Sequence, residues 1–180
     1  MIHLDTNFCW DGSAAHPGEV ARLAVCRSAS GLLWTVDAPY HHDPPPPGPP
    51  GSTWKLWEHE VVELFIVGPD TQYTELEVGP HGHYLALRLQ GVRHVVQREC
   101  PLDTRTVIDG DRWRAQIEVP AGLLPPEPWR ANGFAIHGVG EGRRYLVHTP
   151  LGTEVPDFHR VDRFAPFEPP PPPGRQPPPI

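Results

Sequence analysis

Hydrophobic and polar residues alternate along much of this 180-residue chain. Alternation with a period of two is typical of a β-strand that turns one face toward a core. In residues 72–78, Leu76 and Val78 fall on one face, and Glu75 and Glu77 fall on the other. The segments that we predict to be strands from alternation, or from β-branched and aromatic content, are 19–27, 32–38, 60–67, 72–78, 83–90, 92–99, 112–119, 134–139 and 144–148.

Turn residues such as Gly and Pro separate these segments, and only residues 120–124 suggest a short helix. No alternation of strands with long amphipathic helices is present. Short strands divided by frequent turns favour an antiparallel sandwich or barrel. We therefore predict an all-β fold, an antiparallel β-sandwich.

Many of the 26 prolines fall in two tracts, residues 43–51 and residues 168–180. Proline has no backbone N–H to donate to a sheet, so neither tract is expected to pair as a strand. The first tract predicts a proline-rich loop on the domain, and the second predicts a disordered polyproline tail. The expected organisation is one β-sandwich domain over residues 1–167 and a tail over 168–180.

The net charge of −7 and the pI of about 5.8 argue against nucleic acid as a partner, because binding to phosphates needs a surplus of Lys and Arg. No apolar run reaches the ~18 residues of a membrane helix, and the first residues do not resemble a signal peptide. Three widely spaced cysteines suggest neither a disulfide framework nor a metal site. We expect a cytoplasmic protein with no membrane partner and no cofactor.

Charged residues on one face of the predicted sheet are the first candidates for function. Alternation in 60–67 places Glu63 opposite Val62 and Leu64. If Leu85, Leu87 and Leu89 share the apolar face of Leu76 and Val78, the charged face carries Glu63, Glu75, Glu77 and Arg88. Carboxylates and a guanidinium suit the hydroxyls of a sugar. A solvated outer face of an antiparallel sheet is the alternative interpretation.

Tryptophans outside the strand patterns are the second set of candidates. Trp54 and Trp57 directly follow the first proline tract, and Trp129 lies in a proline-rich turn. Such side chains either stack on a sugar ring or pack down as loop anchors. Trp34 and Trp113 lie within strand patterns, which favours the core.

Two other functions are compatible with the residues. Glu75 and Glu77 are two apart on a strand, so their Cβ atoms should be roughly 6.5–7 Å apart, in the region of glycosidase carboxyl pairs. The tail contains Pro170, Pro173 and Arg175, a pattern that SH3 domains read as a polyproline helix with a basic anchor, and WW domains bind related proline segments.

A series of short motifs follows in order along roughly residues 10–167. They are Trp10-Asp11-Gly12, Ala38-Pro39-Tyr40, Asp43-Pro44-Pro45, Leu56-Trp57, Glu60-Val61-Val62-Glu63, Gln72-Tyr73 with Glu75 and Glu77, Pro80-His81-Gly82, Gly91 with Arg93, Phe134-Ala135-Ile136-His137-Gly138, Arg144-Tyr145 and Pro156-Asp157-Phe158-His159. Together these motifs closely resemble an uncharacterised protein family typified by a vertebrate chromosome-four open-reading-frame product.

The stretch around Trp57, Glu63, Glu75, Glu77 and Arg88 is more distantly similar to family-nine carbohydrate-binding modules and DOMON-like domains. This second likeness implies a β-sandwich of jelly-roll-like, carbohydrate-binding-module-like form, whose concave face and flanking tryptophans hold a sugar. It also allows calcium, although no calcium ligands can be aligned.

The favoured hypothesis is a non-catalytic binding domain for a carbohydrate or similar polar small molecule. Its predicted ligand-binding residues are Trp57, Glu63, Glu75, Glu77, Arg88 and Trp129. The alternatives are a glycosidase-like hydrolase using Glu75 and Glu77 or nearby histidines, and an interaction protein that presents polyproline to SH3 or WW domains.

Overall fold

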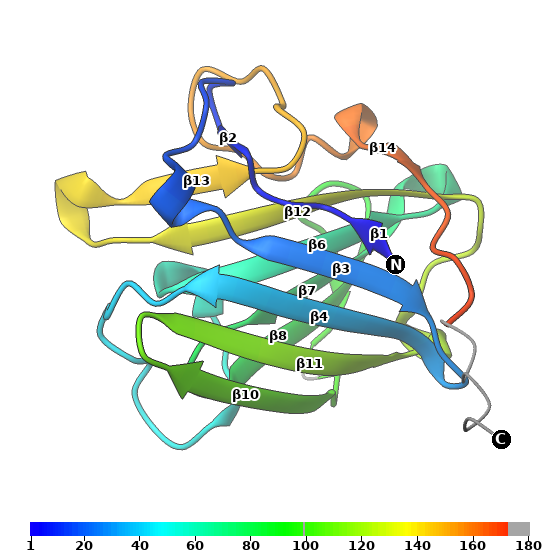
Figure 1. The fold of residues 1–180 in the computed structure, drawn as a ribbon. Coiled ribbons are helices and arrows are strands. Elements are labelled where there is room, and N and C mark those ends of the chain that lie inside the picture. The colour runs from blue at the N-terminus through cyan, green and yellow to red at the C-terminus, as the bar shows by residue number, and fades with distance from the viewer. Residues whose placement is uncertain (99, 173–180) are drawn as a thin grey trace, which may run out of the picture.

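Two β-sheets packed face to face form the molecule (Figure 1). The structure is a computed structural model that describes residues 1–98 and 100–172. The smaller sheet has the strand order β1-β3-β4-β11-β10. Its strands are β1 (Ile2–His3), β3 (Arg22–Arg27), β4 (Gly31–Pro39), β10 (Asp103–Asp109) and β11 (Arg112–Pro120).

The larger sheet has the order β2-β13-β12-β6-β7-β8-β5, with β14 paired to β12 and β9 paired to β8. Its strands are β2 (Phe8–Cys9), β5 (Gly51–Ser52), β6 (Val61–Val67), β7 (Gln72–Val78), β8 (His83–Gln90), β9 (Val95–Gln97), β12 (Trp129–His137), β13 (Arg144–Val147) and β14 (Ala165–Phe167). Within the described residues, only the short pairing of β5 with β8 is parallel. The prediction of an all-β, antiparallel sandwich is confirmed.

The helical segments of the described chain are short 3-10 turns. They are η1 (Pro17–Glu19), η2 (Leu56–Glu58), η3 (Pro69–Thr71), η4 (Ala121–Leu123), η5 (Gly140–Gly142) and η6 (Val161–Arg163). The short helix expected at residues 120–124 is therefore the single turn η4. Across the residues that the structure places, we find no helix long and apolar enough to cross a membrane.

The main core lies between the two sheets. Trp34 and Trp113 from the smaller sheet are fully buried against the inward side chains of β6 and β7, among them Leu64, Ile66 and Leu76. These inward positions follow the alternation of the sequence. Burying aromatic and branched side chains is the main stabilising contribution to such a sandwich.

A second apolar layer covers the outer face of the larger sheet. Phe134 of β12 stacks on Phe158 with ring centroids 4.2 Å apart, and Phe65 of β6 packs edge-on against Phe134. Leu151 and Phe164 from the same C-terminal segment are buried in this layer. As a result all seven residues of β6 are buried, and the interpretation of this face as a solvated one is wrong.

The register of β7 and β8 corrects one expectation. Glu75 pairs with Leu87 and Glu77 with Leu85, so these leucines share the face of the glutamates. Arg88 pairs with Thr74 and lies on the opposite face. The five residues between the paired Val78 and Tyr84 set this register, and alternation within each strand does not reveal how many residues the turn contains.

The proline tracts differ in how far the structure describes them. Residues 43–50 form a loop before β5, fastened where the backbone N–H of Gly138 donates to Asp43 Oδ2 at 2.6 Å. At the C-terminus, the N–H of Arg27 donates to the carbonyl of Pro170 at 2.8 Å. The predicted tail begins at 168, so its first residues contact the sandwich, and residues 173–180, which include Pro173 and Arg175, lie outside the described part.

Candidate ligand pocket

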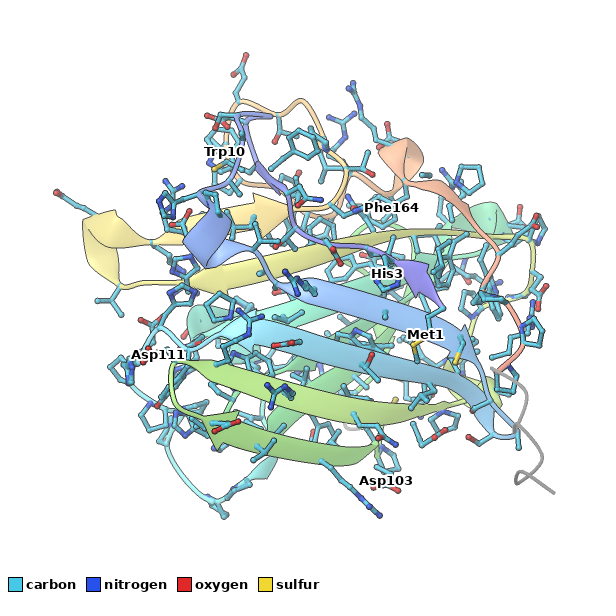
Figure 2. The ribbon with its side chains drawn as sticks, in the orientation of Figure 1. Met1, His3, Trp10, Asp103, Asp111 and Phe164 are labelled. Carbon is cyan, nitrogen blue, oxygen red and sulfur yellow. The ribbon has the colours of Figure 1, made fainter. Side chains whose placement is uncertain are left out.

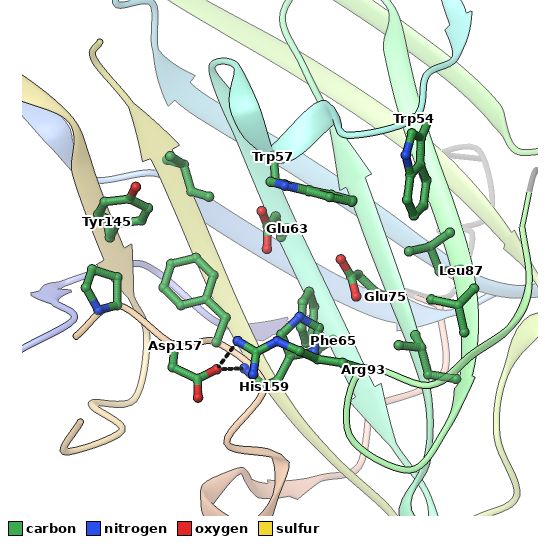
Figure 3. Close-up of a pocket in the computed structure, with 15 residues that line it drawn as sticks. Trp54, Trp57, Glu63, Phe65, Glu75, Leu87, Arg93, Tyr145, Asp157 and His159 are labelled. Atoms are coloured by element: carbon green, nitrogen blue, oxygen red, sulfur yellow. Dashed lines mark hydrogen bonds and ion pairs between the residues drawn. The ribbon is translucent and has the colours of Figure 1, made fainter. Parts of the chain in front are cut away.

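A pocket of about 390 Å³ opens on the outer face of the larger sheet (Figure 3). Its floor comes from β6, β7 and β8, one end is bordered by the turn that carries Trp54 and Trp57, and a wall comes from the segment around Phe158. The residues that line it are Trp54, Trp57, Glu63, Phe65, Glu75, Leu87, Leu89, Arg93, Val95, Ile136, Tyr145, Pro156, Asp157, Phe158 and His159.

Two carboxyl groups lie in the floor of this pocket. Glu63 of β6 and Glu75 of β7 are only 2% and 4% exposed. Figure 3 shows both carboxyls in the space between Trp57 and Phe65. Within the part of the chain that the structure describes, Glu63 Oε1 and Glu75 Oε2 have no hydrogen-bond partner. A buried acceptor without a partner costs roughly 1–3 kcal/mol, so these oxygens are sites that a ligand could satisfy.

A third carboxyl lies beside them beneath the surface. Glu77 pairs with Glu63 across the strands and is fully buried, but it does not line the pocket. The alternation of β6 and β7 brings all three glutamates to the same face. The register of β6 and β7 therefore places Glu63, Glu75 and Glu77 on one face, as predicted.

Burial sets the protonation of this cluster. Loss of hydration raises the pKa of Glu75 to about 7. Burial, reinforced by the neighbouring Glu75 carboxyl, holds the pKa of Glu63 well above its usual range, although Arg143 opposes this. Burial and then the Glu63 and Glu75 carboxyls do the same to the pKa of Glu77. At neutral pH the cluster holds protons that exposed glutamates would have lost.

Aromatic rings border one end of the pocket. Trp54 and Trp57 meet edge to face, with centroids 5.1 Å apart. Lys55 between them adopts a left-handed backbone with φ of 65°, which turns the chain into η2. The guanidinium of Arg143 donates to the carbonyl oxygens of Trp57, Glu58 and Gly138 and so fixes this turn to the neighbouring loop.

The opposite wall is a polar network brought from distant parts of the chain. Arg93 forms an ion pair with Asp157 at 2.9 Å, and the backbone N–H of His159 donates to the same carboxylate at 3.0 Å. His159 Nδ1 lies 2.8 Å from the hydroxyl of Tyr73. Burial lowers the pKa of His159 to about 4 and raises the pKa of Tyr73 to about 12. Both groups are therefore neutral at pH 7.

Three of the predicted ligand-binding residues come together in this pocket, namely Trp57, Glu63 and Glu75. Arg88 lies on the other face of β8, where it donates to Gln97 at 3.3 Å. Trp129 is 6% exposed in the core, with its indole N–H donating to Pro125. The hypothesis of Trp129 as a loop residue beside the ligand is therefore wrong, because it begins β12 and packs inward.

Several pocket residues were not selected from the strand pattern. Arg93, Tyr145, Asp157, Phe158 and His159 are separated from β6 by up to about 100 positions, and alternation carries no information on such contacts. The one available signal was the family resemblance, since Arg93, Arg144-Tyr145 and Pro156–His159 are among its motifs. Among the described residues no group of three His, Cys, Asp or Glu is arranged to hold a metal ion.

Comparison of the sequence with protein-family models gives no match. Comparison with curated proteins gives clear matches. The chain is 38% identical over 170 residues to the UPF0462 protein C4orf33 homolog of Mus musculus, covering 89% of this chain and 88% of that protein. It is 40% identical over 146 residues to the Danio rerio homolog, covering 76% and 74%, and 37% identical over 168 residues to human UPF0462 protein C4orf33, covering 88% and 83%.

Among solved structures, the fold is similar to that of a protein from Bacteroides uniformis ATCC 8492, which is described provisionally as a carbohydrate-binding protein. The TM-score is 0.68, with 91% of this chain and 83% of that protein covered and 14% of residues identical. At this identity the likeness concerns the fold.

Proposed function

The chain belongs to the UPF0462 family of C4orf33 proteins, and we propose that it is a non-catalytic binding protein that holds a carbohydrate in the pocket over Glu63 and Glu75. The observation that carries this proposal is the pair of unpartnered, buried carboxyl oxygens in the pocket floor. Ligand hydroxyls are both donors and acceptors, so they can pair with a carboxyl whether it is protonated or ionised.

The rest of the pocket supports a small polar ligand with an apolar face. A volume of about 390 Å³ is within the range of small-molecule sites. The indole rings of Trp54 and Trp57 and the ring of Phe158 offer aromatic surface, which packs well against the C–H face of a sugar ring. The fold of the Bacteroides uniformis protein is compatible with the same kind of ligand.

The hydrolase alternative is less well supported in the form predicted from the sequence. A glycosidase needs two carboxyl groups that both reach the scissile bond. Glu75 lines the pocket, whereas Glu77 is fully buried and does not. The pair named from the sequence therefore does not form a glycosidase site, and we propose binding without turnover. The SH3 or WW alternative depends on Pro173 and Arg175, and it stays a prediction about residues outside the described part.

A titration of tryptophan fluorescence tests the proposal. We expect at least one of glucose, galactose, mannose, N-acetylglucosamine and glucosamine to change the emission in the millimolar range or below, since Trp54 and Trp57 border the pocket. Glu63→Gln together with Glu75→Gln should weaken binding at least about tenfold, the equivalent of one charge-assisted hydrogen bond.

Glu141→Gln is the matched control, because Glu141 is exposed on the η5 turn away from the pocket. It should bind like the wild type. If no sugar in the panel changes the emission, or if the double variant binds as well as the control, the pocket is not a carbohydrate site. Incubation with the p-nitrophenyl glycosides of the same sugars should release no nitrophenol, and its release would favour the hydrolase.

A further inference from the structure

Two buried carboxyl groups with unpartnered oxygens lie together in the pocket floor, and from this we infer that the carbohydrate it binds carries a protonated amine, as an amino sugar does. The inference rests on the proposed function, because it names the ligand class of the same pocket. It begins from a count of the ionisable side chains that face the carboxyls.

Four carboxyl groups and two guanidinium groups meet here. Glu63, Glu75 and Asp157 line the pocket, and Glu77 lies directly beside Glu63. Arg93 is the partner of Asp157 at 2.9 Å. The charge of Arg143 opposes the raised pKa of Glu63, and three backbone carbonyls, among them that of Trp57, hold its guanidinium. If all four carboxyls were ionised, they would outnumber the two guanidinium groups. Without a ligand, the protons held by the Glu63, Glu75 and Glu77 cluster offset this excess. A cation that enters the floor can therefore take the place of one of these protons.

The geometry of the floor matches an ammonium group. Glu63 Oε1 and Glu75 Oε2 come from neighbouring strands and lack partners among the described residues. A primary ammonium has three N–H donors and no acceptor, so it can satisfy two carboxylates at once. A neutral hydroxyl has one donor and leaves the second carboxylate without compensation.

The rings around the carboxyls favour the same ligand. Trp57 and Phe65 lie on either side of the two carboxyl groups in Figure 3. The quadrupole of an indole ring attracts a cation near its face, and the attraction is stronger when water is excluded. The sugar ring can pack on Trp54 or Trp57 while its amine enters the floor. An anionic sugar would face carboxyls instead of a cation, and we expect its exclusion.

Binding of a cation should release a proton. The groups that face the carboxyls are Tyr73, Glu77, Arg93, Arg143, Tyr145, Asp157 and His159. His159 is neutral, because burial holds its pKa near 4. Glu75 has a pKa of about 7 and is largely protonated at pH 6. An ammonium beside it stabilises the ionised form, so its proton goes to the solvent.

Calorimetric titration of the full chain with glucosamine, glucose and N-acetylglucosamine tests the inference. At pH 7 glucosamine should bind at least about tenfold more tightly than either neutral sugar, because a charge-assisted contact contributes roughly 1.5–3 kcal/mol. At pH 6 an amine of the α-amino type, with a pKa of about 7.7–8.0, is fully protonated. Titration in two buffers of different ionisation enthalpy should then show proton release with glucosamine and none with glucose.

Two variants distinguish the effect of losing the Glu75 carboxyl from the effect of a disturbed fold. Glu75→Gln should lose both the preference for glucosamine and the proton release while it still binds neutral sugars, and Glu141→Gln should retain both. Equal affinity for glucose and glucosamine, or a preference that survives in Glu75→Gln, would overturn the inference and leave the proposed function intact. Absence of binding by all three sugars would contradict the proposed function itself.

Discussion

At the scale of single residues, the pocket depends on glutamates placed where water is scarce. Alternation predicted that Glu63, Glu75 and Glu77 share a face, because the side-chain period of a strand is two. It could not predict their burial, since the cover comes from Leu151, Phe158 and neighbouring residues at the end of the chain. The raised pKa values are therefore a tertiary property with no local signal.

Glu75 gives a prediction about stability and pH. Its pKa is about 7 in the folded chain and 4.5 for an unperturbed glutamate. Between these values the folded state binds more protons than the unfolded state, so the free energy of unfolding falls as pH rises. The shift corresponds to a loss on the order of 3 kcal/mol between pH 4.5 and 8. In denaturant unfolding, the free energy of unfolding of Glu75→Gln should therefore fall over this pH range by about this much less than that of the wild type.

The comparison uses slopes with pH, so any packing change from the glutamine cancels. Glu141→Gln should follow the wild type throughout. Parallel curves for Glu75→Gln and wild type between pH 5 and 8 would mean that the Glu75 carboxyl titrates normally and is open to water.

At the scale of elements, most strands were predictable and one register was not. The predicted segments 72–78 and 83–90 coincide with β7 and β8, because clean alternation and glycine-containing turns bound them. Strand β10 was missed: it lies at the edge of the smaller sheet, and its sequence, DTRTVID, is mostly polar. The pairing of β7 with β8 depends on the turn between them, so Arg88 was placed on the wrong face.

That register makes a prediction that separates neighbouring residues. Leu87 faces the pocket and Arg88 does not. Leu87→Ala should weaken sugar binding severalfold through lost packing, whereas Arg88→Ala should leave the dissociation constant unchanged within error. Fluorescence titration of both variants measures this, with circular dichroism confirming that each is folded. Weakened binding by Arg88→Ala alone would restore the register expected from the sequence.

At the scale of the whole molecule, the sandwich has a second covering layer. The chain returns after β13 and adds β14 beside β12, and Figure 2 labels Phe164 on this returning segment. The segment's buried side chains cover the outer face of the larger sheet. Phe158 and Phe164 pack into this second apolar layer, and Asp157 and His159 complete the pocket wall. The pocket is therefore assembled from strands in the middle of the chain and from the segment that follows β13. A sequence read strand by strand predicts its floor but not its wall.

The central claim is that ligands enter the pocket over Glu63 and Glu75, and the indole N–H resonances of the six tryptophans test it most directly. In a ¹H–¹⁵N spectrum titrated with glucosamine, the resonances of Trp54 and Trp57 should shift progressively. Those of Trp34, Trp113 and Trp129 should remain in place, because these side chains are buried in the core. Shifts confined to other tryptophans, or no shift of Trp54 and Trp57 at saturating sugar, would contradict the account.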